Sequence, residues 1–409
     1  MAFKLPPMSN IMQRRRFGRT EFQMPVFSCG GMRYQQAWGE LEPSAIEPDN
    51  QVNIEATIRH ALELGINHIE TARGYGSSEM QLGWILPKLE REQLIVQTKI
   101  GPNQDSKQFL ESFEKSYSLL GLEQIDLLAF HGINNDVSLD HVLRKGGCLE
   151  VVRQLQREGR VRFVGFSTHG PTDVIVKANA TGEFDYFNLH YYFVNPLNWP
   201  AIAQAKKQDM GVFIISPTDK GGRLQNPSDK MRELCQPLSP MQFNDLWCLS
   251  QPEIHTLSIG ASRPSDFDEH VASLAHYENI EATIAPVQQR IESEIARLFG
   301  EDWLGSWSQG LSPLDEMPEQ FNVREVLRLL TYGKSLDLLE WARGRYNLMK
   351  AGDSWVPGGN AGVLDSPDKW ASIEQSVQAN LFAERIPSLL REAHELLGGE
   401  ERQRLSQGG

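Results

Sequence analysis

The feature that most constrains the fold is a repeated alternation of short apolar runs with amphipathic stretches between residues 26 and 274. Eight runs have the length of β-strands, and the stretches between them, such as 52–64, 106–120, 148–158 and 199–208, are long enough for helices that connect parallel strands. Eight strand–helix units predict one closed α/β barrel, the (β/α)8 TIM barrel. The eight predicted strands are 26–29, 67–70, 94–99, 125–131, 161–167, 184–189, 211–216 and 255–260.

An open, doubly wound sheet is the alternative architecture for such an alternation. Its usual sign, a G-x-G-x-x-G motif directly after the first strand, is absent from the sequence. We therefore expect the barrel over residues 15–274, preceded by an N-terminal arm over residues 1–14.

After residue 275 the sequence pattern changes to helices alone. Segments 281–299, 322–331, 336–349 and 374–397 carry apolar residues at helical spacing. They predict a helical C-terminal extension over residues 275–409, packed on the barrel or on a second copy of the chain, which leaves a homo-oligomer open. We expect residues 398–409 to fray.

Charge and composition argue against several classes of partner. The chain has 40 Lys and Arg against 53 Asp and Glu, a formal net charge of −13, so it repels polyanions and anionic surfaces. We therefore expect no nucleic acid and no membrane as partners.

The Arg14-Arg15-Arg16 run is not followed by the apolar stretch of an export signal. Four cysteines without C-x-x-C spacing predict a reduced, cytoplasmic protein.

Polar side chains close three successive predicted strands. Glu70, Lys99 and His131 end the second, third and fourth, and Tyr75 lies in the loop after the second. In a TIM barrel these ends converge on the mouth where chemistry takes place. An ammonium group in the barrel wall is costly unless a carboxylate pairs with it, and Glu70 supplies one. We expect this pair to lower the pKa of Tyr75 and make it a general acid, and a neutral His131 to orient a substrate carbonyl.

Each of these residues also has a structural interpretation when it is considered alone. Glu70 and Lys99 could form a purely structural ion pair. Tyr75 could be an ordinary turn aromatic, and His131 a core histidine bonded to backbone. Their coincidence at successive strand ends favours a catalytic role.

The segment from Gly65 to Glu79, GINHIETARGYGSSE, resembles the signature of the aldo-keto reductase superfamily, G-x-N-x-x-D-T-A-x-x-Y-G-x-S-E. Lys99 and His131 follow in the family's order, and the resemblance covers residues 15–274. It implies a barrel that reduces small aldehydes or ketones to alcohols with a nicotinamide cofactor, with Tyr75 as the proton donor. The family's aspartate is Glu70 here, and the additional methylene could displace Lys99 or leave Tyr75 less acidic.

The resemblance also implies that the cofactor extends across the mouth. Ser167, Thr168 and Asn188 would hold its carboxamide, with Asn188 in place of a more common glutamine. Tyr191 would stack on the nicotinamide, unless it is a core aromatic. The full implied cofactor-binding set is Ser167, Thr168, Asn188, Tyr191, Ser216, Lys220, Gly222, Gly260, Ser262, Arg263 and His270.

Within that set, the loop from Ser216 to Arg223 would receive the pyrophosphate through its backbone N–H groups. Ser262 and Arg263 are suited to the 2′-phosphate of NADPH, and His270 to the adenine. NADH stays open, because some relatives have a lysine where Gly260 stands. Arg263 could instead be a solvated residue at a helix start.

The extension carries a likeness of its own. Its segment Glu340 to Tyr346, EWARGRY, resembles the C-terminal region of aldo-keto reductases that bear a ferredoxin-type iron–sulfur segment. Such a cluster needs four cysteine thiolates, and no cysteine follows Cys248, so we expect no iron–sulfur cluster. The ten histidines show no H-E-x-x-H helix motif, and we expect no other metal.

The sequence leaves a second function open. A protein of this family could serve as a cofactor-sensing regulatory or binding protein with little turnover, as some channel-associated relatives do. The replacement of aspartate by Glu70 and the acidic extension motivate this alternative.

Overall fold

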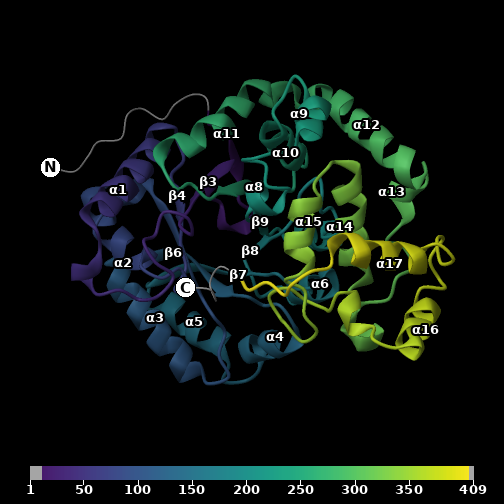
Figure 1. The fold of residues 1–409 in the computed structure, drawn as a ribbon. Coiled ribbons are helices and arrows are strands. Elements are labelled where there is room, and N and C mark those ends of the chain that lie inside the picture. The colour runs from purple at the N-terminus through teal and green to yellow at the C-terminus, as the bar shows by residue number, and fades with distance from the viewer. Residues whose placement is uncertain (1–11, 405–409) are drawn as a thin grey trace.

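The computed structural model describes residues 12–404, and its centre is a closed barrel of eight parallel strands (Figure 1). Neighbouring strands follow one another in chain order, and the last strand pairs with the first to close the barrel. Each strand overlaps one predicted run, so the (β/α)8 barrel is confirmed. The strands are β3 (Phe27–Gly30), β4 (His68–Glu70), β5 (Ile95–Ile100), β6 (Ile125–His131), β7 (Val161–Ser167), β8 (Tyr186–Leu189), β9 (Gly211–Ile214) and β10 (Thr256–Ile259).

Helices surround this barrel (Figure 1). The four crossovers predicted from the sequence correspond to α1, α3, α5 and α7, with ends that differ by at most four residues. The helices of this part are α1 (Pro48–Glu63), α2 (Ser78–Gly83), α3 (Ser106–Leu120), α4 (Asp136–Leu143), α5 (Cys148–Arg157), α6 (Thr172–Ala180), α7 (Trp199–Lys207), α8 (Pro217–Lys220), α9 (Asp229–Cys235), α10 (Pro240–Leu249) and α11 (Asp268–Ser273).

A small antiparallel hairpin closes the bottom of the barrel. β1 (Arg14–Arg16) pairs with β2 (Gln23–Pro25), and between them Phe17 is buried against Tyr186 inside the barrel. Of the predicted arm over residues 1–14, residues 1–11 lie outside the described part of the chain.

Side chains that point into the barrel are apolar at one end of the barrel and polar at the other. Because side chains alternate along a strand, Ile95, Gln97 and Lys99 of β5 share one face and point into the barrel. Ile95 belongs to the apolar cluster at the bottom, whereas the buried Lys99 lies near the carboxyl end of the strand. Glu70 and His131 end the two neighbouring strands. The polar end of the barrel is therefore the mouth.

The C-terminal extension is helical, as predicted, and continues directly from the barrel. α11 leads through a 3-10 segment (Leu274–Asn279) into α12, so the predicted boundary at residue 274 falls within helical backbone. Apolar side chains of the extension, such as Val287, belong to the same core as Leu246 of α10. The helices are α12 (Ile280–Phe299), α13 (Trp303–Ser306), α14 (Val323–Ser335), α15 (Leu339–Tyr346), α16 (Pro367–Ser376) and α17 (Ile386–Leu397).

The prediction of one helix over 374–397 is wrong, because two helices meet there. α16 ends at Ser376 and α17 begins at Ile386. Pro387 lacks an N–H and is best tolerated in a first helical turn, which favours the start of α17 at this point. In the connection, the Asn380 amide donates to the carbonyl oxygens of Trp307 and Gln309 at 2.9 and 2.6 Å.

The end of the described chain lies over the barrel rather than free of it. The Arg402 amide donates to the carbonyl oxygen of Asn347 at 2.8 Å, and the Arg404 guanidinium lies 4.4 Å from the centre of the Trp355 ring. The prediction that residues 398–409 fray is thus wrong for 398–404, and residues 405–409 lie outside the described part. No helix within residues 12–404 is long and apolar enough to cross a bilayer.

Candidate active site

Tyr75, Lys99 and Glu70 meet at the mouth of the barrel. The Lys99 ammonium forms an ion pair with Glu70 and donates to the Tyr75 hydroxyl oxygen at 3.0 Å. It also donates to the carbonyl oxygen of Thr71 at 3.2 Å. Lys99 and Glu70 are 1% and 2% exposed, so the pair holds its geometry without competition from water. The three groups that the sequence singled out are therefore in direct contact.

His131 completes the group. Its ring meets the ring of Tyr75 edge to face, with centroids 5.7 Å apart. Burial, with the charges of Lys99 and Arg404, lowers the pKa of His131 to about 3. A neutral imidazole beside the Tyr75 hydroxyl can hydrogen-bond a carbonyl oxygen without repelling the neighbouring ammonium.

The electrostatics of Tyr75 differ from expectation. We expected the Lys99–Glu70 pair to lower the pKa of Tyr75, but burial dominates and raises that pKa above its ordinary value, and Arg404 opposes only part of the rise. Burial also lowers the pKa of Lys99, which disfavours the ammonium form that would support a phenolate. Tyr75 is consequently held as a protonated phenol, the form that donates a proton.

Glu70 fits without displacing Lys99. Its second oxygen, Oε2, accepts a long hydrogen bond from Ser258 Oγ at 3.5 Å. A Cβ built at Gly30 would lie 3.3 Å from Glu70 Oε2 and 2.5 Å from Ser258 Oγ, so the glycine leaves the space that the longer acid uses. The additional methylene is accommodated at the barrel wall.

Beside this group, His131, Ser167 and Asn188 occupy adjacent positions around the rim. His131 pairs in register with Ser167, and Ser167 with Asn188. Asn188 is fully buried, and within residues 12–404 neither atom of its side-chain amide has a hydrogen-bond partner. An unpaired buried amide is costly, and the carboxamide of a nicotinamide would offer it both a donor and an acceptor. These residues fit that end of the cofactor.

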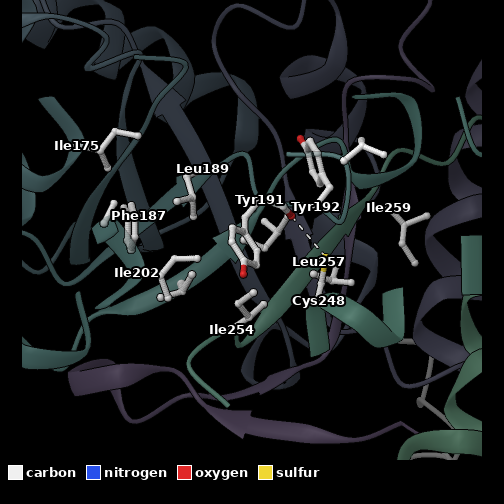
Figure 2. Packing of buried hydrophobic residues seen from close by; sticks show 14 of the residues in the cluster. Ile175, Phe187, Leu189, Tyr191, Tyr192, Ile202, Cys248, Ile254, Leu257 and Ile259 are labelled. Atoms are coloured by element: carbon white, nitrogen blue, oxygen red, sulfur yellow. Dashed lines mark hydrogen bonds between the residues drawn. The ribbon is translucent and has the colours of Figure 1, made fainter. Parts of the chain in front are cut away.

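Two other residues implied at this end are engaged elsewhere. The Thr168 hydroxyl donates to the carbonyl oxygen of Ile133 at 2.7 Å, so it shapes the loop. Tyr191 lies in the apolar core, near Leu189 and Ile254 (Figure 2). Its ring is stacked on that of Trp247, with centroids 5.0 Å apart, and lies 6.0 Å from that of Trp199. Tyr191 thus has a core position between the barrel and its helices, and its stacking on a nicotinamide stays a prediction.

The loop after β9 lies beneath the extension. Ser216 precedes α8 with a left-handed backbone, φ 54°. A Cβ at Gly222 would lie 3.2 Å from Leu338, so the extension closes that side of the loop. The Lys220 ammonium contacts His169 Nδ1 and His190 Nε2 at 3.2 and 3.0 Å. Whether this loop receives a pyrophosphate stays a prediction.

At the end of β10, Gly260, Ser262 and Arg263 are exposed, and Arg263 donates to Asp266 at 3.0 Å. His270, by contrast, is 2% exposed, and its Nδ1 is bonded to Asp245 at 2.5 Å. We expected His270 to contact the adenine. This stays a prediction, and the structure shows the imidazole buried against a carboxylate partner.

Residues of the extension were missed by sequence reasoning. Trp355, in the loop between α15 and α16, lies edge to face against His131 at 5.2 Å and against His169 at 5.1 Å. Arg345 of α15 lines a cavity beside them. Nothing in the local sequence ties this loop to the mouth, which explains why these residues were not found.

The comparison with known proteins agrees with this geometry. A model of the aldo/keto reductase family matches residues 27–284. The chain belongs to the aldo/keto reductase family. The matched range includes Glu70, Tyr75, Lys99 and His131, and most of the extension lies beyond it. The likeness of the extension to iron–sulfur-bearing members of the family stays a prediction. The described residues contain no cluster of side chains that could hold a metal ion.

Several aldo/keto reductases are similar to the chain at low identity. L-galactose dehydrogenase of Arabidopsis thaliana is 26% identical over 270 residues, covering 58% of this chain and 83% of that protein. L-glyceraldehyde 3-phosphate reductase of Escherichia coli K12 is 22% identical over 343 residues, covering 70% of this chain and 94% of that protein. The structure of an aldo-keto reductase from Bacillus halodurans has a TM-score of 0.57 at 20% identity, and the match covers 68% of this chain and 96% of that protein. This likeness supports the fold. The protein is an NAD(P)H-dependent oxidoreductase of this family.

Proposed function

We propose that the protein reduces small aldehydes or ketones to alcohols with NADPH, and that Tyr75 donates the proton. The observation that carries the proposal is the contact of the Tyr75 hydroxyl with the Lys99 ammonium at 3.0 Å, with His131 beside it. Relatives named for an aldose and for a phosphorylated aldehyde support small polar carbonyl compounds as substrates.

Each residue then has a role in the reaction. A bound reduced nicotinamide supplies the hydride that adds to the carbonyl carbon. Tyr75 gives its proton to the carbonyl oxygen, and the Lys99 ammonium stabilises the phenolate until solvent returns a proton. Neutral His131 holds the oxygen in line with Tyr75. Glu70 keeps the ammonium in place.

The choice of NADPH rests on the exposed pair Ser262 and Arg263, since a guanidinium beside a hydroxyl suits a 2′-phosphate. Asn188 and Ser167 are proposed to hold the carboxamide. A cytoplasmic location, the division at residue 274 and a homo-oligomer through the extension stay predictions.

A second function is favoured by one observation, the packing of Trp355 on His131. A covered mouth suits a cofactor-sensing protein with little turnover. Two measurements on the same preparation separate the two functions. The first is the turnover of a panel of aldehydes and ketones with NADPH and with NADH, followed by cofactor absorbance. The second is the dissociation constant of each cofactor. Turnover of at least one substrate class with NADPH supports the reductase. Tight binding of NADPH with negligible turnover supports the sensor.

A further inference from the structure

A cavity of about 120 Å³ lies where the extension meets the mouth of the barrel. Both parts of the chain line it. His169, His190 and Lys220 come from the barrel, and Arg345 and Trp355 from the extension. The cavity therefore exists only because the extension is docked.

Four cationic side chains line this cavity against a single carboxylate, that of Glu325; the cations are Lys220, Arg324, Arg328 and Arg345. Glu325, the acid in its lining, is bonded to Arg328 through both carboxylate oxygens, at 2.7 and 2.8 Å. Among the described residues, the side-chain hydrogen-bond partners of the Lys220 ammonium are the two histidines. Within residues 12–404, the Arg345 guanidinium has no ion pair and no hydrogen-bond partner. Burial lowers the pKa values of Lys220 and Arg345, and the carboxylates of Asp219 and Glu325 offset only part of that effect. An anion bound between the two groups would stabilise their charged forms.

The histidines do not add charge to the cavity. Burial and the neighbouring Lys220 lower the pKa values of His169 and His190 well below the ordinary range, so both rings are neutral. His190 is fixed through Nδ1, which lies 2.6 Å from the Tyr192 hydroxyl. The two rings thus hold the Lys220 ammonium in place.

The cavity and the catalytic group lie on either side of one side chain. The Trp355 indole contacts His131 of the catalytic group and His169 of the cavity at nearly equal centroid distances, 5.2 and 5.1 Å. Trp355 therefore borders both the catalytic group and the cavity. Gly260, Ser262 and Arg263, implied for the adenosine end of the cofactor, do not line this cavity, whereas Lys220, in the loop implied for the pyrophosphate, does.

We propose that Lys220 and Arg345 bind an anionic group, phosphate or carboxylate, that the carbonyl substrate carries a few atoms from its reacting carbon. The planar guanidinium of Arg345 can donate hydrogen bonds to two oxygens of the anion at once. The ammonium of Lys220 supplies a second, compact positive charge. The inference rests on the proposed function and names its substrate class, namely short phosphorylated aldehydes and oxo acids. Arg345 is a specificity-determining residue supplied by the extension.

The first test compares matched substrates in the full chain. Butanal is paired with succinic semialdehyde, and glyceraldehyde with glyceraldehyde 3-phosphate. The parent should favour the anionic member of each pair in kcat/KM by about 10-fold or more, as expected for a charge-assisted contact. Arg345→Met should remove most of that preference through KM. Arg343→Met, on the same helix but outside the cavity lining, should preserve it; Arg343 pairs with Glu340 and donates to the carbonyl oxygen of Leu396. A parent without the preference, or an Arg345→Met protein that keeps it, overturns the proposal.

The second test does not depend on turnover. Calorimetric titration with inorganic phosphate should give a Kd at least about 5-fold weaker for Arg345→Met than for the parent and for Arg343→Met. Phosphate that fails to bind the parent, or binds all three proteins alike, overturns the proposal. A loss of NADPH affinity in Arg345→Met as large as the loss of phosphate affinity also overturns it, because the anion is then the cofactor pyrophosphate. If no carbonyl is reduced but phosphate binding depends on Arg345, the proposed function fails and the anion site stands.

Discussion

The indole of Trp355 meets the imidazole of His131 edge to face, with ring centroids 5.2 Å apart. This contact joins residues 224 positions apart and brings the helical extension into the mouth of the barrel. Gly132 makes it feasible, because a Cβ at that position would lie 2.8 Å from the indole. The extension is therefore part of the candidate active site.

Gly132→Ala should loosen this contact. Gly132 has a φ of +91°, and an alanine would both strain the backbone and clash with Trp355. Gly121→Ala is a matched control, since Gly121 has a φ of +63° but no atom within 4 Å of its built Cβ. The free energy of unfolding should fall by about 1–3 kcal/mol more for Gly132→Ala than for the control. Chemical denaturation measures the free energy of unfolding of both variants. Equal losses would show that Trp355 does not pack closely against residue 132.

Glu70→Gln should damage both stability and activity, because it leaves the buried Lys99 ammonium without its counter-ion. We expect a loss of about 3–5 kcal/mol in the free energy of unfolding and a lower kcat. Glu70→Asp keeps the charge and should recover most of both. A Gln variant as stable and active as the Asp variant would rule out the charge as the reason for Glu70.

Stability should fall as the pH drops below 7. Burial lowers the pKa of His68 to about 3, whereas the unfolded chain protonates this ring near its ordinary pKa of 6.5. Between these two values the unfolded state binds more protons, so acid favours unfolding and the folded state gains as pH rises. From pH 7 to pH 5 the contribution of His68 is about 2 kcal/mol.

Denaturation at pH 7 and pH 5 measures this effect. The parent should lose more stability over that interval than a His68→Gln variant, which has no proton to take up at this position. Equal losses in the two proteins would mean that His68 is not buried as a neutral ring.

Asn188→Leu should separate stability from cofactor affinity. Within the described residues the Asn188 amide has no partner, so an apolar side chain of similar size should leave the free energy of unfolding unchanged or raise it. If the amide holds the carboxamide of the cofactor, the Kd for NADPH should rise about 5- to 50-fold. Asn188→Gln, the residue more common in the family, should retain affinity. An unchanged Kd for Asn188→Leu would remove Asn188 from the cofactor site.

The sequence predicted those features that depend on neighbours along the chain. Strand positions follow from short apolar runs, and the meeting of Glu70, Lys99 and His131 follows from the rule that parallel strands end at one rim. The helix break near Asn380 was missed because the apolar spacing continues through it, and only Pro387 marks the new start.

Features that depend on tertiary packing could not be predicted in the same way. His270 and Tyr191 carry chemistry suited to a nucleotide, yet each is enclosed by partners from distant segments, Asp245 and Trp247. The pKa of Tyr75 likewise depends on how deeply the folded chain buries it and on the charge of the distant Arg404. Composition and spacing do not report that degree of burial.

Tyr75→Phe tests the central claim most directly, because it removes one oxygen and leaves the ring that packs against His131. The measurement is single-turnover reduction of the best substrate with bound NADPH, alongside the Kd for NADPH. We predict a fall in the rate of about 100-fold or more, with an unchanged Kd. A variant that reduces the carbonyl as fast as the parent would contradict the assignment of Tyr75 as the proton donor.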